Sequence, residues 1–209
     1  SPYKHKRIYQ NNFGFFNQEI NNRQSEFGCD WQKSLQIEVN NLFDDGYYIV
    51  TLLDSFKNKF SFPIIINDKE NKKISLLAPI STWVAYNAWG GKSLYSNILD
   101  SSNVYFASTN RPNTLLVGGK HDMNVEANIF NWFEKEYDIN IYPDNILDQH
   151  PDILDDSEII ILSYHCEYIS AKTYNKLIQL VEKNGKSLIS IGGNQIYWKS
   201  KWNSTLNIM

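Results

Sequence analysis

Apolar and polar residues alternate along the first third of the chain as they do in antiparallel strands. Residues 34–40 alternate strictly, and two apolar runs follow at residues 46–53 and 59–66, separated by short polar loops. Period-two alternation bounded by turn residues is typical of strands with one buried face. The pattern predicts a β-rich module of the immunoglobulin-like or edge-strand type over residues 1–73, in which residues 1–30 form irregular structure or edge strands.

From residue 74 onward the pattern changes to strands that alternate with helices. Unbroken apolar runs are typical of strands buried on both faces of a parallel sheet. The predicted strands cover residues 74–79, 138–143, 158–164 and 186–191. Apolar residues at helical spacing predict helices at residues 124–136 and 170–185. This order predicts an α/β domain over residues 74–209, built on a parallel, doubly wound sheet with right-handed crossovers.

The two predicted helices carry apolar faces that are expected to pack on the sheet. The face of the first helix comprises Val125, Ile129, Trp132 and Phe133. The face of the second helix comprises Tyr174, Leu177, Ile178 and Val181. Between the first strand and the first helix, residues 82–95 are predicted to form a loop rich in aromatic rings.

The charge and the apolar runs narrow the class of protein. Among 209 residues, 20 Lys and Arg oppose 23 Asp and Glu, which disfavours a nucleic-acid binder that works by neutralising phosphates. The chain lacks an apolar run of the ~20 residues that a membrane span needs, and it begins without the apolar stretch of a signal peptide. A cytoplasmic compartment is favoured, although the chain opens on Ser1 rather than Met, which leaves room for a removed leader.

Aromatic residues are frequent, since 6 Trp, 13 Tyr and 11 Phe make up 14% of the chain. Most of these rings are expected to fill the core, as Trp132 and Phe133 are on the first helix. The two cysteines, Cys29 and Cys166, are too few for a disulfide-dense scaffold or a zinc site of the CxxC kind.

Ligands bind outside the carboxyl ends of the strands in a doubly wound sheet, so the segments that follow the predicted strands are candidate sites. Residues 82–95 combine a glycine pair, aromatic rings and Asn87, which can line a pocket or simply cover the sheet. Residues 192–194, GGN, can present backbone N–H groups and the Asn194 amide to an oxyanion, or form an ordinary turn.

Residues 164–168, YHCEY, place reactive side chains directly after a buried strand. In one interpretation, Cys166 is a nucleophile activated by a neighbouring histidine. In another, Glu167 is a metal ligand or general base oriented by His165. In a third, the carboxylate caps the helix that begins near Ser170. The residues alone leave all three interpretations open.

Five motifs of the chain occur in the order found in one protein family. They are WVAYNAWGGKSLY at 83–95, NRP at 110–112, NWFEKEYDINIY at 131–142, ILSYHCEYIS at 161–170 and IGGNQIYWKSKW at 191–202. Together with the preceding β-module, these motifs make the chain resemble the C-terminal catalytic region of the N,N-dimethylformamidase large-subunit family, from about Cys29 to Trp202. The resemblance implies that the sheet domain is similar to class I glutamine amidotransferases.

The resemblance also implies a mononuclear ferric iron site with two tyrosine ligands and one glutamate ligand. Tyr86 of AYN matches the first tyrosine, and Glu167 of HCEY matches the carboxylate. The second tyrosine of the family lies in a strand of the form GxY, which points to Tyr48. Tyr47 is the alternative, because a slip of one residue exchanges the two faces of a strand.

Such a site is chemically coherent. Ferric iron suits anionic oxygen donors, and its charge favours the deprotonated form of phenols whose ordinary pKa is ~10. Three protein ligands leave positions at which the metal can activate water and polarise an amide carbonyl. His165 and Asn194 match positions beside the ligands, and they would shuttle a proton to the leaving amine and hold the oxyanion. The sequence therefore predicts a hydrolase of a small amide C–N bond, with His165, Glu167 and Asn194 as its catalytic residues.

Two departures from the family pattern bear on this prediction. Cys166 and Ile169 stand where the family's HDEYW has Asp and Trp, which changes a polar neighbour and a pocket wall. The chain also stops soon after Trp202, whereas family members continue, so the α/β domain is expected to lack its last portion.

Two other functions stay open from the sequence. One is a Cys166-dependent hydrolase related to the amidotransferases, and the other is a non-catalytic binding or assembly module whose aromatic residues 82–95 recognise a partner. The expected partners are a small-molecule amide and, for assembly, a second copy of the chain or an additional subunit. Nucleic acid is not expected as a partner, and no membrane span is expected.

Overall fold

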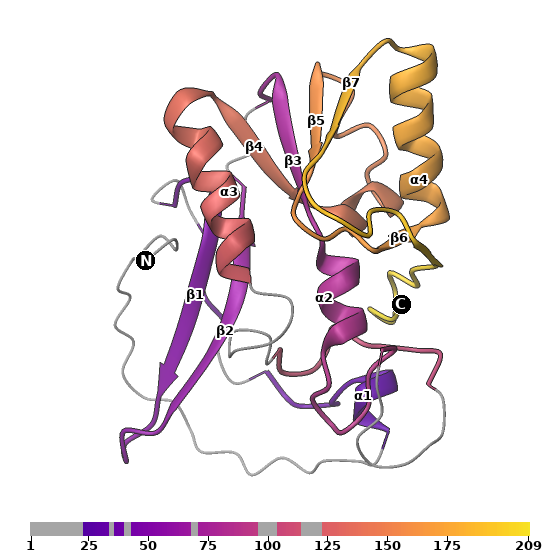
Figure 1. The fold of residues 1–209 in the computed structure, drawn as a ribbon. Helices are drawn as coiled ribbons and strands as arrows, with labels where there is room; N and C mark the ends of the chain where they lie inside the picture. Colours follow the sequence, from indigo (N-terminus) through magenta and orange to yellow (C-terminus); the bar gives the residue numbers. More distant parts are fainter. Residues whose placement is uncertain (1–22, 34–35, 40–42, 68–70, 96–103, 114–122) are drawn as a thin grey trace.

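Figure 1 shows the fold of the computed structural model, which describes residues 23–33, 36–39, 43–67, 71–95, 104–113 and 123–209. The strands are β1 Gly46–Leu53, β2 Lys59–Ile66, β3 Ile74–Ala78, β4 Ile139–Pro143, β5 Ile159–Leu162, β6 Tyr168–Ser170, β7 Ser187–Ser190 and β8 Trp198–Ser200. The α-helices are α1 Gln24–Phe27, α2 Ile80–Tyr86, α3 Met123–Glu136 and α4 Ala171–Ile178. A 3-10 helix, η1, covers Asp144–Asp148, and a π-helical turn, η2, covers Gln179–Lys183.

Four parallel strands form the central sheet, in the spatial order β4-β3-β5-β7. The first strand of this sheet along the chain, β3, therefore lies between the second and the third. The chain leaves β3 toward one edge and later crosses to the other side, which creates a switch point between the carboxyl ends of β3 and β5. The predicted α/β class and parallel sheet are confirmed, and the finer likeness to class I glutamine amidotransferases stays a prediction.

Helices cover both faces of this sheet, α3 on one side and α4 on the other (Figure 1). Alternate residues of a strand face opposite layers. Accordingly, Leu76 of β3 packs in one buried cluster with Phe130 of α3. Its neighbour Leu77 packs in a second cluster with Leu177 of α4. The sheet is thus covered on both sides, as the order of strands and helices predicts.

The faces that the helices bury differ from the predicted ones. In α3 the buried residues are Met123, Glu126, Ala127 and Phe130. Trp132 is 58% exposed, so its predicted place in the core is wrong, while Phe133 packs partly against the core. In α4 the buried residues are Thr173 and Leu177, and Tyr174 is exposed. Small side chains such as Ala127 and Thr173 allow a helix to lie close to the sheet, whereas the Trp132 and Tyr174 rings are exposed.

The predicted strands at 46–53 and 59–66 are confirmed as the antiparallel pair β1 and β2, with Gly46 opposite Ile66. The strand predicted at 34–40 is wrong within residues 36–39, which have no regular structure and are exposed. The rest of that segment, like most of residues 1–30, lies outside the described residues.

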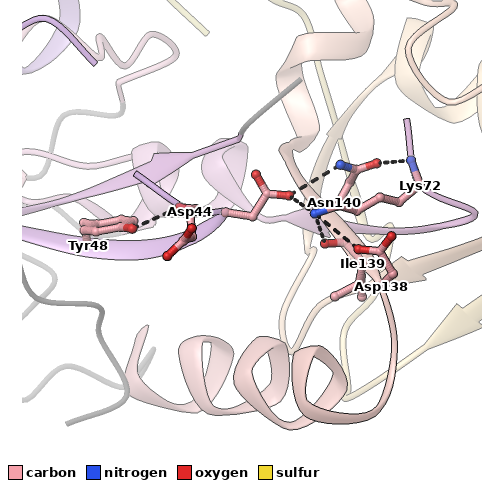
Figure 2. Close-up of polar contacts among 7 residues, drawn as sticks. Asp44, Tyr48, Lys72, Asp138, Ile139 and Asn140 are labelled. Carbon is pink, nitrogen blue, oxygen red and sulfur yellow. Dashed lines mark hydrogen bonds and ion pairs between the residues drawn. The ribbon is translucent and has the colours of Figure 1, made fainter. Parts of the chain in front are cut away.

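A buried ion pair joins the β1–β2 hairpin to the sheet (Figure 2). Lys72 Nζ, just before β3, lies 2.9 Å from Asp45 Oδ2, just before β1. Lys72 Nζ also lies 3.5 Å from Asp138 Oδ1 and from the Ile139 carbonyl oxygen. The Asn140 side chain accepts a hydrogen bond from the Lys72 backbone N–H and donates one to Asp45. The predicted division at residue 73 stays a prediction, but the hairpin and the sheet are in direct polar contact there.

Candidate active site

The candidate site lies at the switch point of the sheet, where α2 follows β3 and residues 163–167 follow β5. The loop predicted at 82–95 is wrong for its first residues, because α2 extends through Tyr86. The helix begins directly after the strand, and its Ser81 N–H donates to the buried carboxylate of Asp144 at 3.0 Å. Tyr86 is thereby placed at the last position of α2.

Three of the predicted site residues meet at this point. The Tyr86 hydroxyl donates to Glu167 Oε2. His165 Nε2 lies 3.4 Å from the same carboxylate oxygen. The Glu167 and His165 side chains are largely buried. A phenol, a carboxylate and an imidazole therefore share one small volume.

The electrostatics of the site favour neutral phenols. Burial raises the pKa of Tyr86 well above its ordinary value, and the hydrogen bond to the Glu167 carboxylate raises it further. Burial and the same carboxylate raise the pKa of Tyr168 to about 12. A cation at this position would act in the opposite direction, because an adjacent positive charge favours the phenolate.

Aromatic rings form the walls of the site. The Tyr95 ring lies 4.6 Å from the Tyr86 ring, and the Tyr168 ring meets Tyr86 edge-on at 6.1 Å. Tyr168 in turn stacks on Trp198 at 6.4 Å. Tyr168 is buried, whereas Tyr95 is 57% exposed. Tyr95 is therefore the solvent-facing ring beside Tyr86.

The predicted GGN turn lies against the segment that carries His165 and Glu167. The Ile196 N–H donates to the Cys166 carbonyl at 2.8 Å, and the Trp198 N–H donates to the Glu167 carbonyl at 2.8 Å. β6 and β8 then pair in parallel, continuing this contact. Asn194 sits in this turn with its side chain exposed. The structure thus brings the turn to the site, and the proposed oxyanion role of Asn194 stays a prediction.

Gln195, which follows Asn194 directly, is a further residue of the site that the sequence motifs do not indicate. Its side-chain amide donates to the Ser163 carbonyl at 3.0 Å, and its side-chain oxygen accepts from the Cys166 N–H at 3.0 Å. The only available signal was an amide side chain next to a glycine turn, which is common on protein surfaces.

The two candidate tyrosines of β1 point in opposite directions, as neighbours on a strand must. The Tyr48 hydroxyl donates to the Asp44 carbonyl at 3.0 Å (Figure 2). The Tyr48 ring packs edge-on against Phe43. Among the described residues, the structure does not bring Tyr48 into contact with Tyr86 or Glu167. Tyr47 instead faces the sheet and packs against Trp83 of α2. The ligand role of Tyr48, with Tyr47 as its alternative, stays a prediction.

Cys166 has the properties of a structural cysteine. Its side chain is buried in the core cluster beneath the site, and Sγ lies 3.5 Å from the Ser163 carbonyl oxygen. Burial raises the pKa of this thiol well above its ordinary value, and the nearby Asp144 and Glu126 carboxylates raise it further. A nucleophilic cysteine needs a thiolate in an accessible, electropositive setting, so this geometry argues against a Cys166-dependent hydrolase.

The helix-cap interpretation of Glu167 is wrong. The N-cap of α4 is Ser170, whose side-chain oxygen accepts from the Thr173 N–H at 2.9 Å. The Glu167 carboxylate instead faces Tyr86 and His165. The position of Glu167 beside Tyr86 and His165 therefore matches its interpretation as a metal ligand or general base.

The site offers oxygen donors from Tyr86 and Glu167 beside the nitrogen of His165. Within the residues that the structure describes, no group of three or more His, Cys, Asp and Glu side chains forms a metal cage. The Tyr86 and Glu167 oxygens, which touch each other, are the hard donors that suit a highly charged cation.

The fold and the site define an α/β protein with a phenol–carboxylate–imidazole group at the switch point of a parallel sheet. Residues 6–208 match the family described as N,N-dimethylformamidase beta subunit-like, C-terminal, so the chain belongs to this family. A search among curated proteins found no match. Of the helices in the described ranges, none combines the length and the hydropathy that a membrane crossing requires.

Proposed function

We propose that the protein hydrolyses the C–N bond of a small amide at the site formed by Tyr86, His165 and Glu167. The observation that carries this proposal is the contact of the Tyr86 hydroxyl and His165 with one Glu167 oxygen at the switch point. Membership of the dimethylformamidase beta subunit-like family supports the reaction class.

We further propose that the site holds one ferric ion. Tyr86 and Glu167 would be two of its ligands, since their oxygens already touch and the Glu167 side chain is largely buried. By the family resemblance, Tyr48 is proposed as the third ligand and Tyr47 as the alternative, although in this structure the Tyr48 hydroxyl donates to the Asp44 carbonyl. When bound, the ion supplies Lewis acidity and positive charge, which favour two adjacent anionic oxygens.

The other residues are proposed to handle protons and charge. His165 lies beside the carboxylate and can carry a proton to the departing amine. Asn194 sits in the turn that packs on residues 166–167, from which its amide can donate to the oxyanion. Tyr95, exposed beside Tyr86, can cover a bound amide and exclude water.

The first prediction concerns metal and colour. Purified protein is expected to contain about one iron per chain and to show the visible charge-transfer band of a ferric phenolate. Tyr86→Phe is expected to abolish that band and to lower kcat/KM for formamide-type amides by at least about a hundredfold, since it removes one donor oxygen. Elemental analysis, visible absorption and an amine-release assay check these outcomes.

Tyr105→Phe is the matched control, because Tyr105 is exposed on a different segment and its substitution is expected to change none of these values. An iron-free, colourless protein whose amide hydrolysis persists in Tyr86→Phe would overturn the proposal. Loss of activity in Cys166→Ala, with Glu167→Gln still active, would instead support the thiol mechanism.

A further inference from the structure

The turn after β7 approaches the segment after β5 more closely than side chains would allow. A Cβ atom at Gly192 would lie 1.9 Å from the Tyr164 carbonyl oxygen, so the backbones touch directly at this residue. Asn194 and Ile196 have φ values of 52° and 55°, in the left-handed region. That conformation is uncommon for any residue with a side chain and exceptional for β-branched isoleucine. Such strain persists where neighbouring contacts hold it in place.

Gln195, between the two strained residues, supplies those contacts. Its Nε2 lies 3.0 Å from the Ser163 carbonyl oxygen, 3.3 Å from that of Tyr164 and 3.1 Å from that of Ile191. Its Oε1 accepts from the Cys166 backbone N–H at 3.0 Å. One side chain therefore binds three backbone groups of the segment that carries His165 and one of its own turn.

We propose that Gln195 is a positioning residue, which holds residues 163–167 so that the His165 and Glu167 side chains face Tyr86. The segment after β5 must turn sharply, because Cys166 enters the core while Glu167 faces the site. Residues 163–167 belong to no helix or strand, and their backbone is held by the Gln195 amide together with the Ile196 and Trp198 N–H groups. The effect of this positioning on catalysis rests on the proposed function, whereas the structural part does not.

We call the four contacts of the Gln195 side chain the clasp. The hydrogen-bonding groups that it needs restrict which side chain can form it. The amide offers two N–H donors and one acceptor oxygen, and both its donor and its acceptor groups are used. Methionine matches its length without either group. Glutamate keeps the acceptor but places a negative charge against three carbonyl oxygens. Asparagine keeps both groups on a side chain that is one methylene shorter.

The first test needs neither metal nor substrate. Backbone amide hydrogen exchange is measured by mass spectrometry on the full chain, comparing Gln195→Met with the wild type. Exchange of the Cys166 amide, followed in a peptide covering residues 163–170, is expected to accelerate roughly tenfold. The reason is that Gln195 no longer protects this N–H. Peptides of α3 are expected to be unchanged. The matched control is Gln149→Met, on an exposed side chain away from the site, which is expected to alter neither region.

The second test measures function. Gln195→Met is expected to lower kcat about tenfold to a hundredfold with KM changed by less than about threefold, and to weaken the phenolate band of the iron-loaded protein. Gln195→Glu is expected to behave like Gln195→Met at neutral pH, and Gln195→Asn to recover part of kcat. Should Gln195→Met not fold, the Glu and Asn variants carry the same comparison.

Unchanged exchange at residues 163–170 would overturn the clasp itself. Faster exchange with unaltered kcat and band would overturn the positioning role. If the wild type binds no iron and hydrolyses no amide, the proposed function fails, and the exchange experiment still decides whether Gln195 holds the segment.

Discussion

Asp144 is a buried carboxylate that holds the first turn of α2 in place. Its Oδ1 accepts from the Ser81 N–H, and the residue is 2% exposed at the carboxyl end of β4. Burial raises the pKa of Asp144 from its ordinary 3.8 to about 7, and the nearby Asp148 carboxylate adds to the rise. Because α2 ends at Tyr86, the protonation state of Asp144 affects the helix that positions this residue of the site.

The pH dependence of stability follows from the sign of that shift. The native state retains the Asp144 proton between pH 4 and pH 7, where the unfolded state has released it, so stability falls as the pH rises through this range. Asp144→Asn keeps an acceptor for Ser81 and removes the titration. Relative to the wild type, the variant is expected to gain up to about 4 kcal/mol in free energy of unfolding between pH 4 and pH 8.

Urea denaturation at a series of pH values measures this difference. Asp152→Asn, an exposed substitution in the following turn, is the control and should leave the pH profile unchanged. Parallel profiles for Asp144→Asn and the wild type would show that Asp144 is not protonated in the native state.

At the scale of residues, motif order indicated Tyr86, His165 and Glu167, and the structure brings these three together. Gln195 and Asp144 could not be found in this way. The contacts of Gln195 depend on the parallel register of β5 and β7, which sets residues about 30 positions apart side by side. Such non-local geometry leaves no periodic signal in one sequence.

At the scale of elements, one buried arginine organises the segment that follows α2. Arg111 Nη2 donates to the Val84 carbonyl at 3.1 Å, near the end of α2. Its Nη1 donates to the Trp89 carbonyl at 2.8 Å and to the Lys92 carbonyl at 3.3 Å. Burial lowers the pKa of this guanidinium to about 10, which still leaves it charged at neutral pH. The NRP motif thus acts as a clamp on the helix and loop that carry Tyr86 and Tyr95.

Arg111→Met is therefore expected to lower the free energy of unfolding by about 2–4 kcal/mol, because it leaves several buried carbonyl groups without a donor. The same change is expected to make residues 84–95 more sensitive to limited proteolysis. Chemical denaturation and peptide mapping check both outcomes. Arg23→Met, on an exposed side chain, should change stability by no more than about 0.5 kcal/mol. Equal stability of the two variants would contradict the clamp.

The sequence predicted the sheet strands and long helices because their apolar patterns are local. It missed α2 because Ser81, Thr82, Trp83, Val84 and Ala85 are all buried. A helix enclosed on every side has no solvent-exposed face, so hydrophobic periodicity cannot distinguish it from a loop. The predicted helix faces failed for a related reason, since large rings such as Trp132 extend to the margin while small residues make the closest contacts.

At the scale of the whole molecule, the hairpin and the sheet share a core as well as an ion pair. Tyr47 of β1 packs with Trp83 and Phe130 in the cluster between α3 and the sheet. No local pattern in the sequence reports such packing between the two predicted parts, and the boundary at residue 73 is predicted from the change to alternating strands and helices that follows it. Two units that share a buried cluster are expected to unfold together.

The neighbouring lysines Lys72 and Lys73 allow this cooperativity to be tested. The Lys72 and Asp45 side chains are only 11% and 3% exposed, whereas those of Lys73 and its partner Glu158 are 69% and 65% exposed. Lys72→Met leaves the Asp45 carboxylate buried beside an apolar side chain, so it is expected to cost about 3–5 kcal/mol. Lys73→Met should cost less than about 1 kcal/mol. Adding Asp45→Asn to Lys72→Met should restore part of the loss, because the uncompensated charge is gone.

Urea unfolding followed by both tryptophan fluorescence and circular dichroism distinguishes one cooperative unit from two domains. In a single unit the two signals coincide in the wild type and move together to lower urea in Lys72→Met, because the ion pair stabilises the hairpin and the sheet at once. A variant in which the two transitions separate, with the sheet as stable as before, would show that the hairpin is an independent domain.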